Sequence, residues 1–379
     1  MKKRVIMLTA LAVAVCGIFA GCSKTGTETK SSTKSVTSAT SSAAASSTAS
    51  TKSEAKTDDA NKKFSVVCTI FPEYDWIRQL VGDKKDNYEI TYLLDKGVDL
   101  HSYQPTAEDI AKIANCDLFV YVGGESDGWV NDALKESKND KMQVVNLLET
   151  LGKNVKPEEV VEGMQEEDEH DHDHDHDDKD HDDKDHDHDD KDHDHDHEEE
   201  TEYDEHVWLS LRNATALVNT LAEKLQTIDP ENKDYYATTA ADYTAKLGDL
   251  DSRYLATIKK AKVKTVLFGD RFPFRYLVDD YGLKYYAAFV GCSAETEASF
   301  ETVAFLAKKT DDLKLKNVLV IENSDQKIAK KIVETTKDKN QNIVVLNSMQ
   351  SITNEDIANG ATYLSIMESN LKALASALK

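Results

Sequence analysis

Ten of the chain's twelve histidines lie in one acidic tract. Imidazoles alternate there with aspartates, as over residues 172–176. Neutral imidazole is a good ligand for Zn²⁺, and aspartates attract any divalent cation. Because a low-complexity tract does not preorganise four ligands around one ion, we expect it to bind several ions weakly, as an accessory metal loop. A charged linker with no metal role is the alternative. The ten residues are His170, His172, His174, His176, His181, His186, His188, His193, His195 and His197.

The two remaining histidines are candidates for a tighter site. His101 lies in a polar turn over residues 95–105, between an expected strand and an expected helix, and His206 follows the acidic tract directly. Sites in parallel α/β folds gather at the carboxyl ends of strands, where His101 is expected. A lone histidine is more often an ordinary surface or core residue. Beside a metal-gathering tract we interpret both as ligands of one ion, with Trp208 packed beneath His206.

The net charge of -24 is concentrated in the same tract. Residues 166–205 hold 25 acidic side chains and three lysines, so the remainder of the chain carries a net charge of only -2. This distribution removes the argument for a uniformly acidic surface and for nucleic-acid binding. We therefore expect no nucleic-acid partner.

Residues 1–22 have the features of a lipoprotein signal peptide. Basic residues precede an apolar run over residues 5–20 that is too short to span a membrane, and Gly21 stands directly before Cys22. We expect lipid on Cys22 to anchor the protein at the extracytoplasmic face of the cell membrane. An ordinary secretory signal is the alternative. Residues 23–63, rich in Ser, Thr, Ala and Lys, are expected to form a disordered tether.

Strand and helix signals alternate from residue 64 onward. Apolar and β-branched runs predict the strands, which Pro72 and glycines interrupt. Thr106 and Asp109 predict a capping box at the start of a helix. This rhythm indicates a mainly parallel sheet with helices on both faces. Strands are expected at 64–70, 88–94 and 118–122, and helices at 75–81 and 106–113.

A long helical region and a second alternation follow. Residues 231–260 predict a helix of about 45 Å after a break at Asp229-Pro230. Such a rod could join two lobes as a spine. Later strands are expected at 265–268, 285–289, 317–321 and 343–346, and helices at 274–281, 299–310, 326–337 and 362–378.

More than 300 residues follow the tether, too many for one comfortable core. We therefore predict an α/β fold of two lobes. The expected parts are an N-terminal α/β lobe at 64–210 containing the His/Asp-rich loop 163–205, linking helices at 211–262 and a C-terminal α/β lobe at 263–379.

The cysteines do not form a disulfide framework. Cys16 would leave with the signal peptide, and three cysteines remain in the body besides Cys22. A bridge between Cys68 and Cys116 is possible because each ends or precedes an expected strand. Buried free thiols are at least as good an interpretation, and Cys292 has no partner in either case.

Two segments resemble the ligand loops of a known family. Residues 99–109 are similar to a loop of pattern His-x-Tyr-x-Pro-Thr/Ser, and residues 204–210 to one of pattern Asp-x-His-x-Trp-Leu-Ser. These loops belong to the substrate-binding proteins of zinc and manganese ABC importers, and the acidic His-rich insertion is typical of the zinc-type (ZnuA-like) branch. The resemblance covers about residues 64–379. It implies two α/β lobes bridged by one long helix, with the metal in the cleft between them.

The third ligand departs from that family pattern. The resemblance places it after the first strand of the second lobe, where zinc-type relatives usually have histidine and manganese-type relatives glutamate. Residues 267–277 contain no histidine, and the usual position falls on Arg271, which cannot ligate a cation. We predict that Asp270 is the third ligand and that Arg271 orients it. A pair that only caps the following helix is the alternative.

The fourth ligand is left open among Glu73, Glu205, Asn347 and water. Two imidazoles and a carboxylate also suit Mn²⁺ and Fe²⁺, whereas the ten extra imidazoles favour zinc.

The resulting hypothesis is a monomeric, lipid-anchored protein that captures Zn²⁺ and delivers it to an ABC-type permease, and that is not an enzyme. A manganese or iron homologue, a secreted zinc-dependent hydrolase and a zinc-stabilised adhesin are the alternatives. The chain has no H-E-x-x-H motif to favour the hydrolase.

Overall fold

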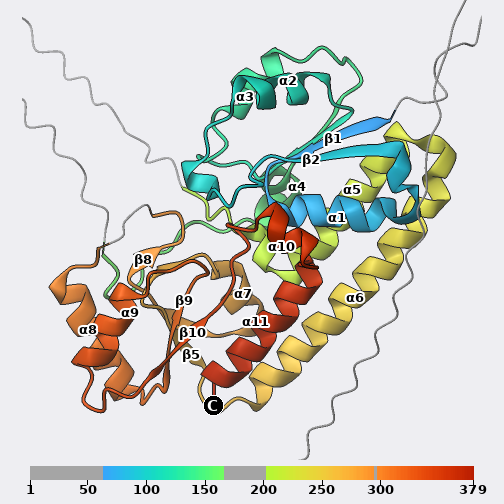
Figure 1. Ribbon diagram of the computed structural model, residues 1–379. Coiled ribbons are helices and arrows are strands. Elements are labelled where there is room, and N and C mark those ends of the chain that lie inside the picture. Colours follow the sequence, from blue (N-terminus) through green and yellow to red (C-terminus); the bar gives the residue numbers. More distant parts are fainter. Residues whose placement is uncertain (1–62, 166–201, 294–296) are drawn as a thin grey trace, which may run out of the picture. The chain divides into compact units, whose positions relative to one another are not determined.

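Strands and helices alternate along the body of the chain (Figure 1). The computed structural model describes residues 63–165, 202–293 and 297–379. The expected signal peptide, residues 23–62 of the expected tether and the ten histidines of the accessory loop lie outside these residues. The described stretches belong to one compact unit, Thr57–Lys379.

The first half is built on a parallel sheet of order β2-β1-β3-β4. Its central strands are apolar and largely buried, as strands covered on both faces must be. Figure 1 shows α2 and α3 on one side of the sheet and α1 and α4 on the other. The strands are β1 (Phe64–Cys68), β2 (Tyr88–Tyr92), β3 (Leu118–Tyr121) and β4 (Gln143–Asn146). The helices are α1 (Phe71–Val81), α2 (Ala107–Asn115), α3 (Val130–Lys135) and α4 (Leu147–Leu151).

Helix α1 begins earlier than the sequence predicts. Pro72 lies in the first turn of α1, where backbone N–H groups have no acceptor within the helix. The N–H that proline lacks therefore costs no hydrogen bond, and the helix can begin here. The Glu73 carboxylate accepts the Thr69 and Ile70 N–H groups at 2.9 and 3.3 Å and so caps this end. The capping box that Thr106 and Asp109 predict for α2 is confirmed.

The second half repeats the parallel arrangement with shorter strands. β5 pairs with β7, β9 with β10 and β6 with β8, and a bridge between Phe268 and Leu319 joins the first two pairs. Figure 1 shows α8 and α9 on one side of β9 and β10, with α11 on the other. The strands are β5 (Thr265–Leu267), β6 (Arg271–Phe272), β7 (Lys284–Tyr286), β8 (Phe289–Val290), β9 (Asn317–Val320) and β10 (Asn342–Val345). The helices are α7 (Arg275–Tyr281), α8 (Phe300–Asp312), α9 (Lys327–Thr335), α10 (Asn354–Ala358) and α11 (Tyr363–Ala377).

One long helix runs along both halves. α5 (Leu211–Ile228) ends at the expected break, and α6 (Lys233–Lys260) follows with 28 residues, about 42 Å in length. α6 contacts α1 and α5 at one end and α7 and α11 at the other. The predicted α/β fold of two lobes with a spine helix is thereby confirmed, whereas the lobe boundaries at 210 and 263 stay predictions.

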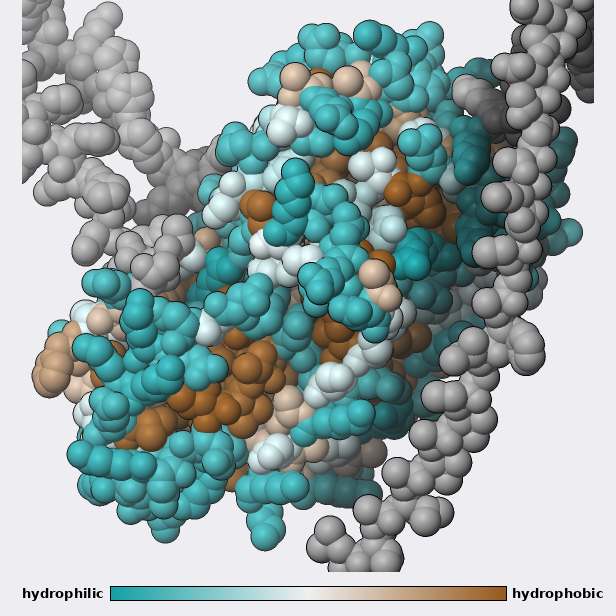
Figure 2. All heavy atoms as spheres, viewed as in Figure 1, coloured by the Kyte–Doolittle hydropathy of each residue, from teal (hydrophilic) through white to brown (hydrophobic). Residues whose placement is uncertain are grey.

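The exposed surface is mostly hydrophilic on the face shown in Figure 2. Hydrophobic side chains gather there over the region of β9 and β10, and Val345 on the edge strand β10 is exposed. Among the described residues, none of the helices combines the length and apolarity that membrane crossing requires. Cys68 and Cys116 are both buried free thiols, so the possible bridge between them is not formed.

Candidate metal centre

The loop after β2 fixes the backbone of His101, and two residues from other segments contact one of its ring nitrogens. His101 lies in the 3₁₀ helix η2 (Leu100–Ser102), and its N–H donates to Asp99 Oδ1 at 3.1 Å. On the ring, Nδ1 lies 2.7 Å from Ser126 Oγ and 3.5 Å from Glu205 Oε2. Both neighbours can accept a hydrogen bond, so the ring proton is favoured on Nδ1. Nε2 is then left with its lone pair.

His206 is fully buried and more tightly oriented. His206 directly precedes the 3₁₀ helix η4 (Val207–Leu209). Asp204 Oδ1 accepts the backbone N–H of His206 at 2.9 Å and lies 3.0 Å from its Nδ1. The ring lies 5.2 Å from the Trp208 ring, which confirms the expected packing. A carboxylate on Nδ1 is the usual partner of a metal-binding histidine, because it fixes the tautomer that presents Nε2.

The two free ring nitrogens meet. Nε2 of His101 lies 3.2 Å from Nε2 of His206, although the residues are 105 positions apart. With both protons held on Nδ1, two lone pairs face each other, and a cation between them turns this repulsion into coordination. Two nitrogens bound to a tetrahedral ion at 2.0–2.1 Å would lie roughly 3.3 Å apart, which matches the observed separation.

The electrostatic surroundings keep His101 in its ligating form. Burial, followed by the proximity of His206, lowers the pKa of His101 to about 3. Burial also raises the pKa of Glu205, whose Oε1 accepts the Ser126 N–H at 2.9 Å. Gly124 has a φ of +81°, and a Cβ at this position would collide with the Glu205 carboxylate. Only glycine therefore permits this acid to approach the back of His101.

Cys292 joins the two imidazoles in a group of three side chains that could hold a metal ion. Among the described residues, His101, His206 and Cys292 form a group whose ligand atoms all lie within 4.8 Å of one another. Cys292 follows β8, and its N–H donates to Glu158 Oε1 at 3.1 Å. Burial raises the pKa of the Cys292 thiol well above its ordinary value, with the charge of Glu158 as the next cause. The sequence interpretation left this cysteine without a role.

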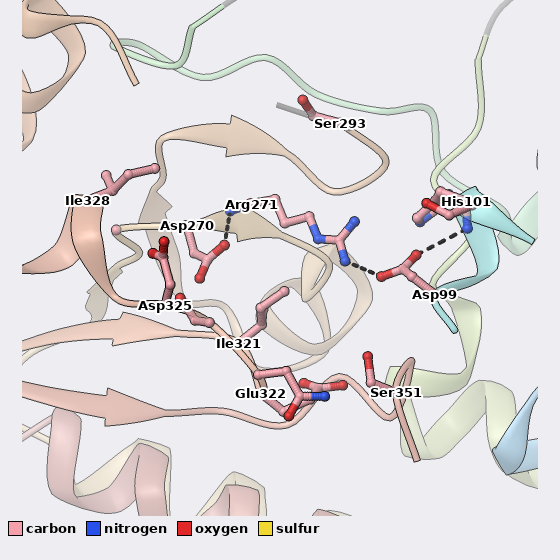
Figure 3. Close-up of a pocket in the computed structure, with 14 residues that line it drawn as sticks. Asp99, His101, Asp270, Arg271, Ser293, Ile321, Glu322, Asp325, Ile328 and Ser351 are labelled. Atoms are coloured by element: carbon pink, nitrogen blue, oxygen red, sulfur yellow. Dashed lines mark hydrogen bonds and ion pairs between the residues drawn. The ribbon is translucent and has the colours of Figure 1, made fainter. Parts of the chain in front are cut away.

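Asp270 lies near this group but is not a member of it. It lines a pocket of about 480 Å³ together with Asp99, His101 and Arg271. Its Oδ1 accepts the Arg271 N–H at 3.0 Å, and burial raises its pKa. Figure 3 shows the Arg271 side chain extending between Asp270 and His101 to form an ion pair with Asp99. Asp270 as third ligand stays a prediction. The Arg271 guanidinium forms its ion pair with Asp99, while its charge is a minor influence that opposes the raised pKa of Asp270.

The other predicted ligands lie in different surroundings. Glu205 faces Nδ1 of His101, the side of the ring away from His206. Glu73 is fully buried at the start of α1, where it caps the helix. Asn347 donates its N–H to Asn370 Oδ1 at 2.8 Å in the loop after β10. The fourth ligand therefore stays a prediction for all three residues.

The orienting residues were only partly visible in the sequence. Asp204 stands two residues before His206 in the second motif, so its role could have been inferred from that spacing. Ser126 lies 25 positions after His101 and carries no local signal. Cys292 could have been suspected only because it is the third cysteine of the body.

Two α/β halves joined by a long helix, with a buried imidazole pair, define a two-lobed metal-binding protein. The family model for the periplasmic component A of the zinc-uptake complex, ZnuA, matches residues 66–377. The chain belongs to this family, as the two ligand loops indicated.

Curated relatives agree with the family assignment. The chain is 32% identical over 321 residues to the high-affinity zinc uptake system protein ZnuA of Bacillus subtilis, and the match covers 85% of the chain and 89% of the relative. It is 31% identical over 315 residues to the zinc-binding lipoprotein AdcA of Streptococcus pneumoniae. That match covers 83% of the chain and 56% of AdcA, so the chain spans little more than half of that relative.

Solved structures show the same fold. The Zn(II)-bound ZnuA-like domain of Streptococcus pneumoniae AdcA matches with a TM-score of 0.60 and 27% identity, over 83% of this chain and 99% of the domain. The metal-dependent lipoprotein YcdH of Bacillus subtilis matches with a TM-score of 0.63 and 28% identity, again over 83% and 99%.

Proposed function

We propose that this chain captures Zn²⁺ outside the cytoplasm and delivers it to an ABC-type permease. The ion would be bound by Nε2 of His101 and Nε2 of His206. The protein binds the ion as transported cargo and performs no chemistry on it. The family, whose model describes a component of a zinc-uptake complex, supports a transport role over an enzymatic one.

The observation that carries the proposal is the 3.2 Å separation of the two Nε2 atoms. Each ring has an acceptor at Nδ1, so the free lone pairs converge where a cation is required. A purely structural histidine pair would more naturally place one N–H against one lone pair.

Zinc is favoured over manganese or iron. Imidazole is a borderline ligand that suits zinc, whereas manganese prefers carboxylate and carbonyl oxygens. The relatives named above are zinc uptake or zinc-binding proteins, and one related domain was solved with Zn(II). The ten histidines of the accessory loop also favour zinc over manganese and iron.

The location and the partner follow from the same proposal. Lipid on Cys22 would anchor the chain at the outer face of the membrane, and residues 23–63 would tether the metal-binding body near the permease. The name of AdcA as a lipoprotein supports the anchor. We propose that the protein acts as a monomer.

A competition titration tests the metal site. The purified protein is titrated with Zn²⁺ against a fluorescent chelator, and His101→Ala and His206→Ala should each weaken tight binding by more than about tenfold. His197→Ala, in the accessory loop, is the matched control and should leave the tight site unchanged. Equal affinities in all four proteins would rule out the imidazole pair.

Growth under zinc starvation tests the transport role. A strain lacking the chain should grow poorly when zinc is chelated, and added zinc should restore growth. The wild-type gene should rescue it, whereas a His101→Ala/His206→Ala gene should not. Normal growth of the deletion strain in zinc-starved medium would count against transport.

A further inference from the structure

We propose that the Cys292 thiolate is the third zinc ligand, so that a His₂Cys set replaces the third ligand of the family pattern. This inference rests on the proposed zinc-binding function and names a residue that the family pattern does not assign. It is carried by the geometry: the ligand atoms of His101, His206 and Cys292 all lie within 4.8 Å of one another.

The backbone brings Cys292 to this place through a short parallel strand pair. β6 and β8 pair through Arg271 with Phe289 and Phe272 with Val290, and Cys292 follows two residues later. Parallel strands direct the residues after their carboxyl ends to the same edge, where binding sites gather. The Cys292 loop is therefore fixed by pairing with the strand that begins at Arg271, the position where family members usually carry the ligand.

Gly291 lets this loop contact His206. A Cβ on Gly291 would lie 3.1 Å from Cε1 and 3.2 Å from Nδ1 of His206, and 2.9 Å from the Phe272 carbonyl oxygen. These distances are shorter than ordinary van der Waals contact, so a larger residue would push the loop away from the imidazole. The absence of a side chain lets the Gly291 backbone, directly before Cys292, lie against the ring.

Glu158 ties the same loop to the segment that carries His206. Its Oε1 accepts the Cys292 N–H, and its own N–H donates to the Glu202 carbonyl at 3.0 Å. Pro157 forms an antiparallel bridge with Tyr203, three residues before His206. The segments that carry Cys292 and His206 are thus both tied to residues 157–158, which supports the preorganisation that ligation requires.

The position of Arg271 makes the Asp270 carboxylate a weaker candidate than Cys292 for the third zinc ligand. Its guanidinium lies between Asp270 and His101 and pairs with Asp99 (Figure 3). A divalent ion shared by Asp270 and His101 would lie beside this fixed positive charge, and like charges at short range repel. The thiol of Cys292 comes from a different segment, the loop that follows β8.

A thiolate also changes which metals the site accepts. Sulfur is a soft ligand that favours Zn²⁺ and disfavours Mn²⁺, so a His₂Cys set would sharpen the discrimination that two imidazoles provide. When the zinc–sulfur bond forms, the S–H bond breaks and the proton passes to the buffer. The fourth position would be open to water or to the receiving permease.

X-ray absorption at the zinc edge tests the ligand directly on the full chain. The protein is loaded with half an equivalent of Zn²⁺, so that the tight site fills before the accessory loop. A sulfur neighbour at about 2.3 Å is expected together with nitrogen neighbours. A shell of only nitrogen and oxygen would overturn the inference, and the measurement needs no substitution that could unfold the protein.

Two matched cysteine variants and one carboxylate variant complete the test. Cys292→Ser should remove the sulfur neighbour and weaken zinc binding by more than about a hundredfold. Cys116→Ser, which alters another free thiol, and Asp270→Asn should keep the sulfur neighbour and change the affinity less than about threefold. Loss of binding in Asp270→Asn with full binding in Cys292→Ser would assign the carboxylate instead.

The two proposals fail in different ways. If His101→Ala and His206→Ala abolish tight binding while Cys292→Ser does not, the zinc-binding function stands and the thiolate ligand is wrong. If the wild-type chain shows no tight zinc binding, the proposed function itself is wrong. Far-ultraviolet circular dichroism of each variant without metal separates a lost ligand from a lost fold.

Discussion

At the residue scale, the proton on His206 is controlled by one carboxylate. Asp204 Oδ1 faces Nδ1 of His206 at 3.0 Å, and this contact fixes the tautomer and the orientation of the ring. Asp204→Asn keeps an oxygen acceptor but removes the charge, so the zinc affinity should fall by roughly 10- to 100-fold. Competition with a chelator measures it, and the exposed Asp242→Asn serves as control. An unchanged affinity would show that the charge of Asp204 does not act on the metal.

A second residue-scale prediction concerns Glu73. Burial, and then the charge of Asp127, raises the pKa of Glu73 from 4.5 to about 8. The folded protein therefore holds a proton that the unfolded chain loses above pH 4.5. The stabilisation is complete below that pH and is lost as the pH rises toward 8. Asp127, with a pKa of about 7, acts in the same direction.

Glu73→Gln should reduce this pH dependence. The free energy of unfolding of the metal-free wild type should fall by on the order of a few kcal/mol between about pH 5 and pH 8, and less in the variant. Denaturant unfolding in the presence of a chelator measures the slope. The exposed Glu89→Gln should retain the wild-type slope. A steeper fall in Glu73→Gln would contradict the assignment.

At the element scale, helix α2 depends on its capping box. Thr106 Oγ1 accepts the Asp109 N–H at 3.2 Å, and Asp109 Oδ2 accepts the Thr106 N–H at 3.0 Å. Thr106→Ala should lower the free energy of unfolding by about 1 kcal/mol, whereas Thr106→Ser keeps the hydroxyl and should change it little. Thermal unfolding compares the variants. The zinc affinity should stay the same, because Thr106 is exposed and its side chain is hydrogen-bonded to Asp109.

Elements set by local patterns were predictable from the sequence. The capping box of α2, the break before α6 and the long helix after that break follow from side-chain chemistry within a few residues, although α6 begins at Lys233 and not at residue 231. The two-residue strands β6 and β8 exist only through their pairing with each other, so no local pattern announces them. β4, with Gln and Asn at its ends, was missed for the same reason.

The residues of the candidate site also differ in whether a local sequence pattern could reveal them. His101 and His206 were found because they are rare and lie in recognisable loops. Cys292 lies after β8, and its approach to His206 depends on Gly291, on the β6–β8 pairing and on Glu158. Each of these contacts joins segments that are distant in the chain. Local spacing could therefore indicate Asp270 but could not weigh it against the cysteine.

At the scale of the whole molecule, an ion pair joins the two halves beside the site. Asp99 of the first half accepts the His101 N–H and pairs with Arg271 of the second half. Arg271→Ala should loosen this link and speed zinc dissociation by about two- to tenfold, a modest effect because the pair is partly exposed. Stopped-flow transfer of zinc to a chelator measures the rate. Arg253→Ala, which breaks the exposed pair with Glu368, should leave it unchanged.

The accessory loop and the imidazole pair are expected to bind zinc differently, the loop with several weak sites and the pair with one tight site. The ten loop histidines belong to a low-complexity tract, so each ion there should be weakly held, whereas His101 and His206 are fixed by folded segments. Deleting residues 166–200 should therefore lower the number of zinc ions bound and leave one tight site with its affinity changed less than about threefold. Calorimetric titration gives both values. A deletion variant that loses the tight site would show that the loop supplies an essential ligand, and the imidazole pair would then be only part of the centre.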